Sequence, residues 1–102
     1  MVEAIGHTGH YDYVEFVAEY APFDLHDLDN LGRAGDLYDL SMMIKVDAEH
    51  RAYVAQRAVG SGFHSVLFAD VRSAEEAAEC VRCVRACLLY TSDAADDLWW
   101  GG

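Results

Sequence analysis

The chain has 102 residues, a hydrophobic fraction of 53% and a formal net charge of −11. This length allows one domain, and the apolar content is ample for a core. With only seven lysines and arginines, the chain cannot build a basic surface that neutralises phosphates, so neither nucleic acid nor membrane is expected as a partner. It has no run of about 18 apolar residues and no signal peptide pattern, which predicts a cytoplasmic protein.

The first two predicted elements are a helix end and a strand. Residues 1–10 have the pattern of the last turns of a helix, closed by Gly6 and Gly9. Tyr11–Tyr20 then alternates between two side-chain sets, which predicts a strand with one face covered by helices. The set expected on the covered face is Val14, Phe16 and Ala18. Pro22 cannot continue a strand ladder and ends this element.

A helix is predicted over residues 24–37. Asp24 precedes the first apolar position and Asp27 follows three residues later, which indicates an N-cap and an acidic first turn. The apolar stripe is Leu25, Leu28, Leu31 and Ala34. Gly32 and Gly35 are expected to weaken the second half of this helix, each by about 1 kcal/mol relative to alanine.

The second strand–helix unit begins with the short apolar strand Met42–Val46, which contains a single cation, Lys45. Asp47 is the predicted N-cap of the helix that follows. That helix is expected to end at Gly60 or Gly62.

The third unit begins with Ser65–Val71, an almost entirely apolar strand. Ser73 and Glu76 then have the spacing of a capping box, which predicts a further helix. Cys80 and Cys83 lie on it as a C-x-x-C pair. Because no second cysteine or histidine pair follows at a suitable distance, small buried thiols are favoured over a zinc site.

Three strands that begin near residues 12, 42 and 65, with a helix in each gap, have the spacing of parallel crossovers. The pattern predicts an α/β fold with a parallel sheet. Ligands of such sheets bind at the carboxyl ends of the strands. The polar residues expected there are Glu19, Tyr20, Lys45, Asp47 and Asp70.

Each of these candidates also has a structural interpretation. An unpaired cation in an apolar strand is costly to bury, so Lys45 is predicted to bind an anionic substrate or to pair with Glu19 or Asp70. Glu19 and Asp70 are alternatively solvated or capping residues, and Tyr20 is alternatively a packing residue. The histidines are scattered and are expected to be surface or hydrogen-bonded residues. They are His7, His10, His26, His50 and His64.

Residues 87–102 have a different character, with no continuing helix stripe and an end of Trp99, Trp100 and two glycines. The segment LLYTSDAAD is similar to translated adapter read-through found behind unrelated proteins. Residues 87–102 are therefore predicted to be a non-native or disordered tail.

Residues 1–86 resemble the HpcH/HpaI aldolase and citrate lyase family. The resemblance rests on the order and spacing of YDYVEFVAEYAPFDLHDLDNL, MMIKVD and AQRAVGSGFHSVLFADVRSAEEAAECVRCVR. These segments are similar to the second, third and fourth units of the family's barrel. The resemblance implies a partial TIM (β/α)8 barrel of about three consecutive strand–helix units, and a longer parent protein.

By this resemblance the parent is a metal-dependent carbon–carbon lyase and a homo-oligomer. In the family, a divalent cation (Mg²⁺ or Mn²⁺) polarises a 2-oxo acid, and a 4-hydroxy-2-oxo acid is cleaved to pyruvate and an aldehyde. The resemblance implies catalytic roles for Glu19, Tyr20 and Lys45, and substrate binding by Lys45 and Asp70. The family's metal-binding carboxylates lie on later strands, so this chain alone is expected to lack the metal and to be inactive.

Two positions depart from the family pattern. Many members have Glu-His where this chain has Glu19 and Tyr20, and arginine where it has Lys45. A neutral tyrosine is no base near pH 7, and lysine lacks the two-pronged guanidinium. These departures permit a non-catalytic binding module derived from a barrel. A second alternative, suggested by the size and acidic composition of the chain, is a flavodoxin-like or receiver-like binding module; it would have an acidic pair at the end of its first strand and five strands, whereas three are predicted here.

Overall fold

The computed structural model describes residues 1–85; the predicted tail at 87–102 lies outside the described residues. The elements are α1 (Val2–Thr8), β1 (Tyr13–Val17), α2 (Leu25–Leu37), β2 (Ser41–Val46), α3 (Arg51–Gly60), β3 (Ser65–Phe68) and a helix that begins at residue 74. This last element is called the 74–85 helix. Alternating strands and helices confirm the predicted α/β class.

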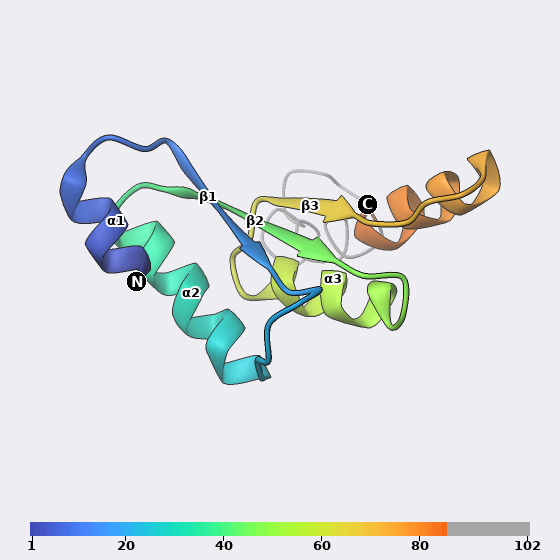
Figure 1. The fold of residues 1–102 in the computed structure, drawn as a ribbon, viewed down its shortest axis with the longest axis horizontal. Coiled ribbons are helices and arrows are strands. Elements are labelled where there is room, and N and C mark those ends of the chain that lie inside the picture. Colours follow the sequence, from blue (N-terminus) through green and yellow to red (C-terminus); the bar gives the residue numbers. More distant parts are fainter. Residues whose placement is uncertain (86–102) are drawn as a thin grey trace, which may run out of the picture.

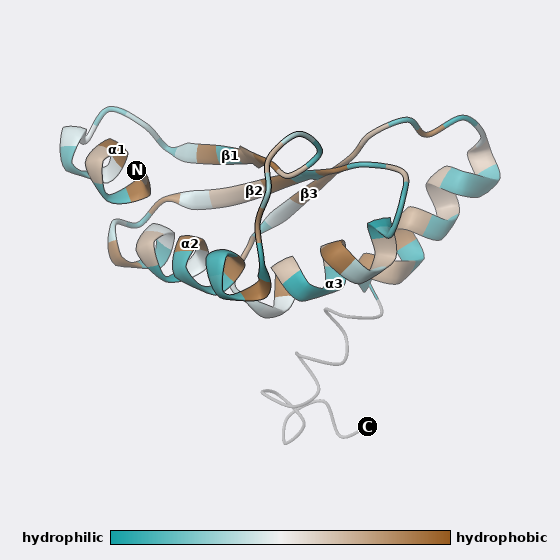
Figure 2. Ribbon diagram, turned by 60° about the horizontal axis from the view of Figure 1, so that its bottom comes forward, coloured by the Kyte–Doolittle hydropathy of each residue, from teal (hydrophilic) through white to brown (hydrophobic). Residues whose placement is uncertain are grey.

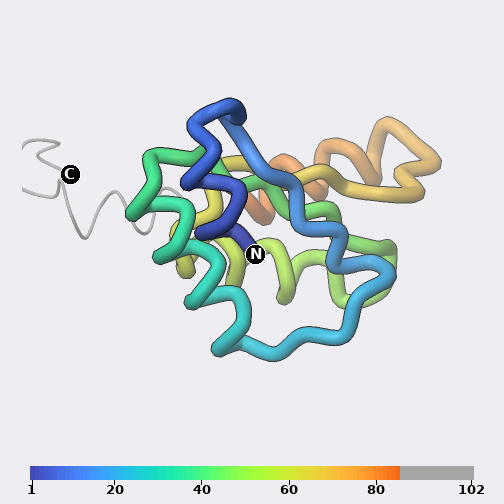
Figure 3. The backbone as a smooth tube through the Cα atoms, turned by 60° about the vertical axis from the view of Figure 1, so that its left-hand side comes forward, coloured from blue at the N-terminus to red at the C-terminus, as the bar shows by residue number. Residues whose placement is uncertain are grey.

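The three strands form one parallel sheet in the order β1-β2-β3 (Figure 1). Both α2 and α3 lie on the same side of this sheet (Figure 2). Helix α1 packs beside α2 (Figure 3). The sheet is therefore covered on one face, and the described residues place no helix over the opposite face, which is called the helix-free face below.

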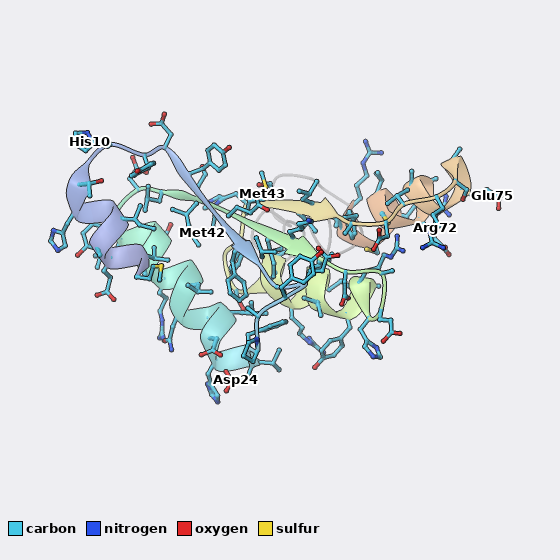
Figure 4. All side chains as sticks on the ribbon, in the orientation of Figure 1. His10, Asp24, Met42, Met43, Arg72 and Glu75 are labelled. Atoms are coloured by element: carbon cyan, nitrogen blue, oxygen red, sulfur yellow. The ribbon has the colours of Figure 1, made fainter. Side chains whose placement is uncertain are left out.

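The core lies between the sheet and α2 and α3, with the middle strand at its centre. Met42, Ile44 and Val46 of β2 are buried and point toward the helices, where they meet Leu28. Val14, Phe16 and Ala18 also pack against this core, as predicted. Met42 and Met43, labelled in Figure 4, show the alternation, because the first is buried and the second is only half-buried on the helix-free face.

Helix α2 begins at a complete capping box. The Asp27 backbone N–H donates to Asp24 Oδ1 at 2.8 Å, and the Asp24 N–H donates to Asp27 Oδ2 at 2.9 Å. Two backbone donors that the helix leaves unpaired are thereby satisfied. The sequence prediction of an N-cap at Asp24, at the lower end of α2 in Figure 4, is confirmed.

Replacing Asp24 with alanine is expected to lower the free energy of unfolding by about 1 kcal/mol, because both capping hydrogen bonds are lost. Urea unfolding followed by circular dichroism measures the change. Asp29→Ala is the matched control, since it removes the same charge from an exposed position of α2 and should change stability by less than about 0.5 kcal/mol. Equal losses in the two variants would contradict the capping role.

Both outer strands are shorter than predicted. β1 spans Tyr13–Val17 in place of Tyr11–Tyr20, because the chain turns away after the Ala18 N–H bonds the Lys45 carbonyl. β3 ends at Phe68 in place of Val71, since Asp70 adopts a left-handed backbone conformation with φ of 57°. The carboxyl edge of the sheet therefore lies three residues earlier in both β1 and β3 than the sequence pattern indicates.

Three local predictions are wrong. Gly6 lies inside α1, and only Gly9 closes that helix with a left-handed conformation. Asp47 is not an N-cap, because residues 48–50 form a turn and α3 begins at Arg51 after a left-handed His50. Leu25 is 48% exposed, since the first turn of α2 extends beyond the sheet.

Other boundaries agree with the predictions. α3 ends at Gly60, and the Glu76 N–H donates to Ser73 Oγ at 3.0 Å at the start of the 74–85 helix. None of the described helices is long and apolar enough to cross a membrane.

Candidate functional site

The candidate site lies on the helix-free face at the carboxyl edge of β1 and β2. Val17 of β1 and Leu67 of β3 are the register partners of Lys45, so the three side chains form one row across this face. Glu19 follows Val17 by two residues. The parallel register therefore brings Glu19 beside Lys45, although 26 positions separate them in the sequence.

Glu19 and Lys45 form an ion pair, with 3.1 Å between Glu19 Oε1 and Lys45 Nζ. The Glu19 side chain is 11% exposed and the Lys45 side chain 30% exposed. Glu19 Oε1 is buried and makes no well-aligned hydrogen bond within residues 1–85, so the ammonium group is what compensates its charge. This arrangement matches the structural interpretation of Lys45 as one half of an ion pair.

The pairing with Glu19 raises the pKa of Lys45 above its ordinary value. The close contact with the Glu19 carboxylate and its negative charge are the main causes, and Tyr20 and Glu15 contribute in the same direction. Burial opposes the shift but is outweighed. Lys45 is therefore a permanent cation at neutral pH and cannot serve as a proton acceptor there.

Tyr20 completes the cluster from the turn after β1. Its ring centroid lies 5.8 Å from Lys45 Nζ, which is within range of a cation–π contact. Tyr20 is 79% exposed, so its ring lies open to solvent and is not packed against the core. The structure thus brings together the three residues to which the family resemblance assigns catalytic roles.

Asp70 stays apart from this cluster. It follows β3 at the same edge of the sheet, where the Ala69 N–H still donates to the Val46 carbonyl at 3.0 Å. Its side chain is exposed, and within the described part of the chain Lys45 pairs with Glu19 and not with Asp70. Asp47 likewise stays apart and lines a small pocket of about 230 Å³ beside α3 with His50 and Val54.

A second polar cluster, which the sequence pattern did not reveal, joins α3 to the 74–85 helix. Arg51 Nη2 lies 3.5 Å from Glu76 Oε1, and Arg51 Nη1 donates to Cys80 Sγ at 3.1 Å. The contact with Cys80 is the main cause that raises the pKa of Arg51. The C-x-x-C spacing marks Cys80 in the sequence. Its contact partner, Arg51, lies 29 positions earlier, and no local sequence pattern predicts that contact.

Two histidines are hydrogen-bonded within the described residues, in agreement with the sequence analysis. His64 Nδ1 accepts from the Met42 N–H at 3.1 Å, and His7 Nε2 lies 3.0 Å from the Tyr38 hydroxyl. Within residues 1–85 no group of three or more histidine, cysteine, aspartate or glutamate side chains could hold a metal ion.

Comparison of the chain with protein-family models, with curated proteins and with solved structures finds no match.

Proposed function

We propose that residues 1–86 form part of the barrel of a carbon–carbon lyase, an aldolase that cleaves 4-hydroxy-2-oxo acids to pyruvate and an aldehyde. One observation carries the proposal: a charged Lys45 on the helix-free face, held by Glu19 at the carboxyl edge of a parallel sheet. The resemblance of the three segments to the HpcH/HpaI family supplies the reaction class. Lys45 is the residue through which this chain would contact the substrate.

The arrangement of the sheet supports the barrel interpretation. Three parallel strands lie side by side in chain order, with α2 and α3 on one face only. This is the arrangement of consecutive units in a (β/α)8 barrel, whose inner face carries no helices. The first three strands of a flavodoxin-like sheet would have the first strand between the second and the third, and β1, β2 and β3 taken as those strands differ from that order. In the proposed barrel, the row of Val17, Lys45 and Leu67 faces the interior.

The proposed chemistry assigns a limited role to each residue. Lys45 Nζ has three hydrogens, and its ion pair with Glu19 leaves at least one of them able to bind a substrate oxygen. When the bond between C3 and C4 breaks, its electron pair forms an enolate on the 2-oxo acid, and a nearby ammonium stabilises that charge. The 4-hydroxyl group loses its proton as the aldehyde C=O bond forms, and the aldehyde leaves. A proton added at C3 of the enolate gives pyruvate, so the proton count is unchanged. Glu19 fixes the position of the ammonium.

A divalent metal does not fit the described residues, because they offer no cluster of three or more suitable ligands. The Mg²⁺ or Mn²⁺ that the family resemblance implies would need ligands from outside residues 1–85. The contribution proposed for this chain is therefore restricted to binding the substrate anion and stabilising charge through Lys45.

A second candidate function is a non-catalytic, barrel-derived binding module. The observation that favours it is the neutralisation of Lys45 by Glu19, with Glu15 adding a further negative charge nearby. An incoming carboxylate must compete with these groups. A module of this kind would keep the ion pair for stability and would bind no 2-oxo acid.

Enzyme assays of the parent protein separate the two candidates. The longer reading frame of the source DNA should encode a protein that releases pyruvate from 4-hydroxy-2-oxo acids with Mg²⁺ or Mn²⁺. Lys45→Met is expected to lower kcat/KM by about 10²- to 10³-fold, as for loss of a charge-stabilising donor. Arg33→Gln is the matched control, because it removes an exposed cation from α2, and it should leave the rate unchanged. Absence of pyruvate release with either metal would overturn the lyase proposal in favour of the binding module.

A further inference from the structure

The contact between Arg51 and Cys80 lies in a pocket with a second thiol. This pocket, of about 420 Å³, is lined by Arg51, Ala52, Glu76, Glu79, Cys80 and Cys83. Cys80 is buried, with 4% of its surface exposed, whereas Cys83 is half-buried. No disulfide joins the two sulfurs, which share one cavity, so a small molecule that enters the pocket meets Cys83 more readily than Cys80.

We propose that Cys80 and Cys83 form a dithiol site that reacts with small cationic disulfides and closes an internal Cys80–Cys83 disulfide. The thiol reaction at this site is independent of the proposed lyase activity. Arg51 pairs with Glu76 in the pocket wall, and Glu79 adds one further negative charge, which favours a cationic reagent over an anionic one.

The reaction has two exchange steps. The Cys83 thiolate attacks the small disulfide, whose S–S bond breaks, and a mixed disulfide forms as the first small thiolate leaves. The Cys80 thiolate then attacks the Cys83 sulfur, forms the Cys80–Cys83 bond and releases the second small thiolate. The two protons from the protein thiols end on the two small thiols. The protein loses two electrons, and the small disulfide gains them.

Arg51 determines which thiol completes the reaction. Its guanidinium donates to Cys80 Sγ at 3.1 Å and stabilises negative charge on that sulfur. The Cys83 thiol points back along the helix toward Cys80, since its Sγ lies 3.2 Å from the Cys80 carbonyl oxygen. The attacking sulfur is thus held in the charge-stabilised position, and the sulfur under attack lies over the same turn.

Helix geometry permits the bond and also makes it labile. Residues three apart in an α-helix have Cα atoms about 5 Å apart, inside the disulfide range of about 4.4 to 6.8 Å. Their Cβ atoms, however, are about 5 to 6 Å apart, whereas a disulfide needs about 3.5 to 4.5 Å. The helical turn must tighten on closure. A bond formed in this way is easily reduced again, as expected of a reversible redox site.

Cystamine is the probe for this site, used on the full chain with Cys87→Ser so that Cys80 and Cys83 are the two cysteines. Intact-mass measurement with thiol alkylation should show both thiols lost, a mass lower by two hydrogens and no retained cysteamine. The Cys80→Ser variant should stop at the mixed disulfide on Cys83. The Cys83→Ser variant should react about tenfold more slowly, because Cys80 is buried.

Arg51→Gln tests the positioning role of the guanidinium, and Arg57→Gln on the same helix is its control, since Arg57 stacks on Tyr53 instead. The mixed disulfide should accumulate in the first variant and not in the second. In urea, where the contact between Arg51 and Cys80 is absent, the two variants should react at the same rate. Circular dichroism in the absence of urea verifies that both variants fold. A persistent mixed disulfide in the Cys87→Ser chain, or equal closure rates for both arginine variants in the folded state, would overturn the proposal.

Discussion

Replacing Gly32 with alanine is expected to lower the free energy of unfolding by about 2 to 3 kcal/mol, although alanine is the better helix former. Gly32 is buried in α2 where that helix passes α3, and an added Cβ would overlap the backbone carbonyl oxygen of Ser61. Backbone atoms cannot rotate away as a side chain can, so the two helices must separate. Urea unfolding of the two proteins measures the loss.

Two other glycines provide controls for this prediction. Gly60 has no atom near the position of an added Cβ, so Gly60→Ala should leave stability unchanged or raise it by up to about 1 kcal/mol. Gly35→Ala should have an intermediate effect, because its Cβ would overlap Cγ and Sδ of the buried Met42 side chain, which can rotate, and would approach the Leu40 carbonyl oxygen less closely. If Gly32→Ala proves as stable as Gly60→Ala, α2 and α3 do not cross as closely as described.

Replacing Lys45 with methionine is expected to destabilise this chain more than Glu19→Gln does. The shift of the urea midpoint should be about twice as large for Lys45→Met as for Glu19→Gln. Methionine leaves the Glu19 carboxylate, which is 11% exposed, without a compensating charge. Glutamine leaves Lys45, which is 30% exposed and can regain water. The double variant should recover part of the loss, because no uncompensated charge then remains. Additive losses would contradict a direct interaction between the two side chains.

The pH dependence of the same pair has a defined sign. Because pairing raises the pKa of Lys45 above its ordinary value of 10.5, the stability it contributes is complete below pH 10.5 and is lost as pH rises through the higher folded value. The difference in unfolding free energy between the natural chain and Lys45→Met should therefore be constant from about pH 7 to 9 and should shrink above pH 10.5. A difference that already disappears between pH 7 and 9 would contradict this assignment.

Local patterns predicted most of the elements. The Asp24 cap, the apolar β2 strand and the Ser73 hydroxyl at the start of the 74–85 helix are each determined within a few residues, and the structure contains all three. The sequence predictions were wrong where one local residue pattern occurs in two kinds of structure. Asp47 has the composition of a cap but precedes a turn, and Gly6 has the composition of a helix end but lies within α1.

The candidate site was predictable only in part. Parallel strands place their carboxyl ends at one edge of a sheet. The sequence alone therefore predicts that Glu19, Tyr20 and Lys45 lie in the same region. It could not choose between Glu19 and Asp70 as the partner of Lys45. The register of β1 on β2, with Val17 opposite Lys45, decides that choice in favour of Glu19.

The sequence by itself determined the α/β class, the order of the elements and the composition of the middle strand, because caps, periodicity and apolar runs act over short distances along the chain. Only the tertiary structure decided that one face of the sheet carries no described helix, that Gly32 meets Ser61, and that Arg51 reaches Cys80. These contacts join residues about 30 positions apart. They depend on strand register and helix crossing, which are set by how the whole core packs.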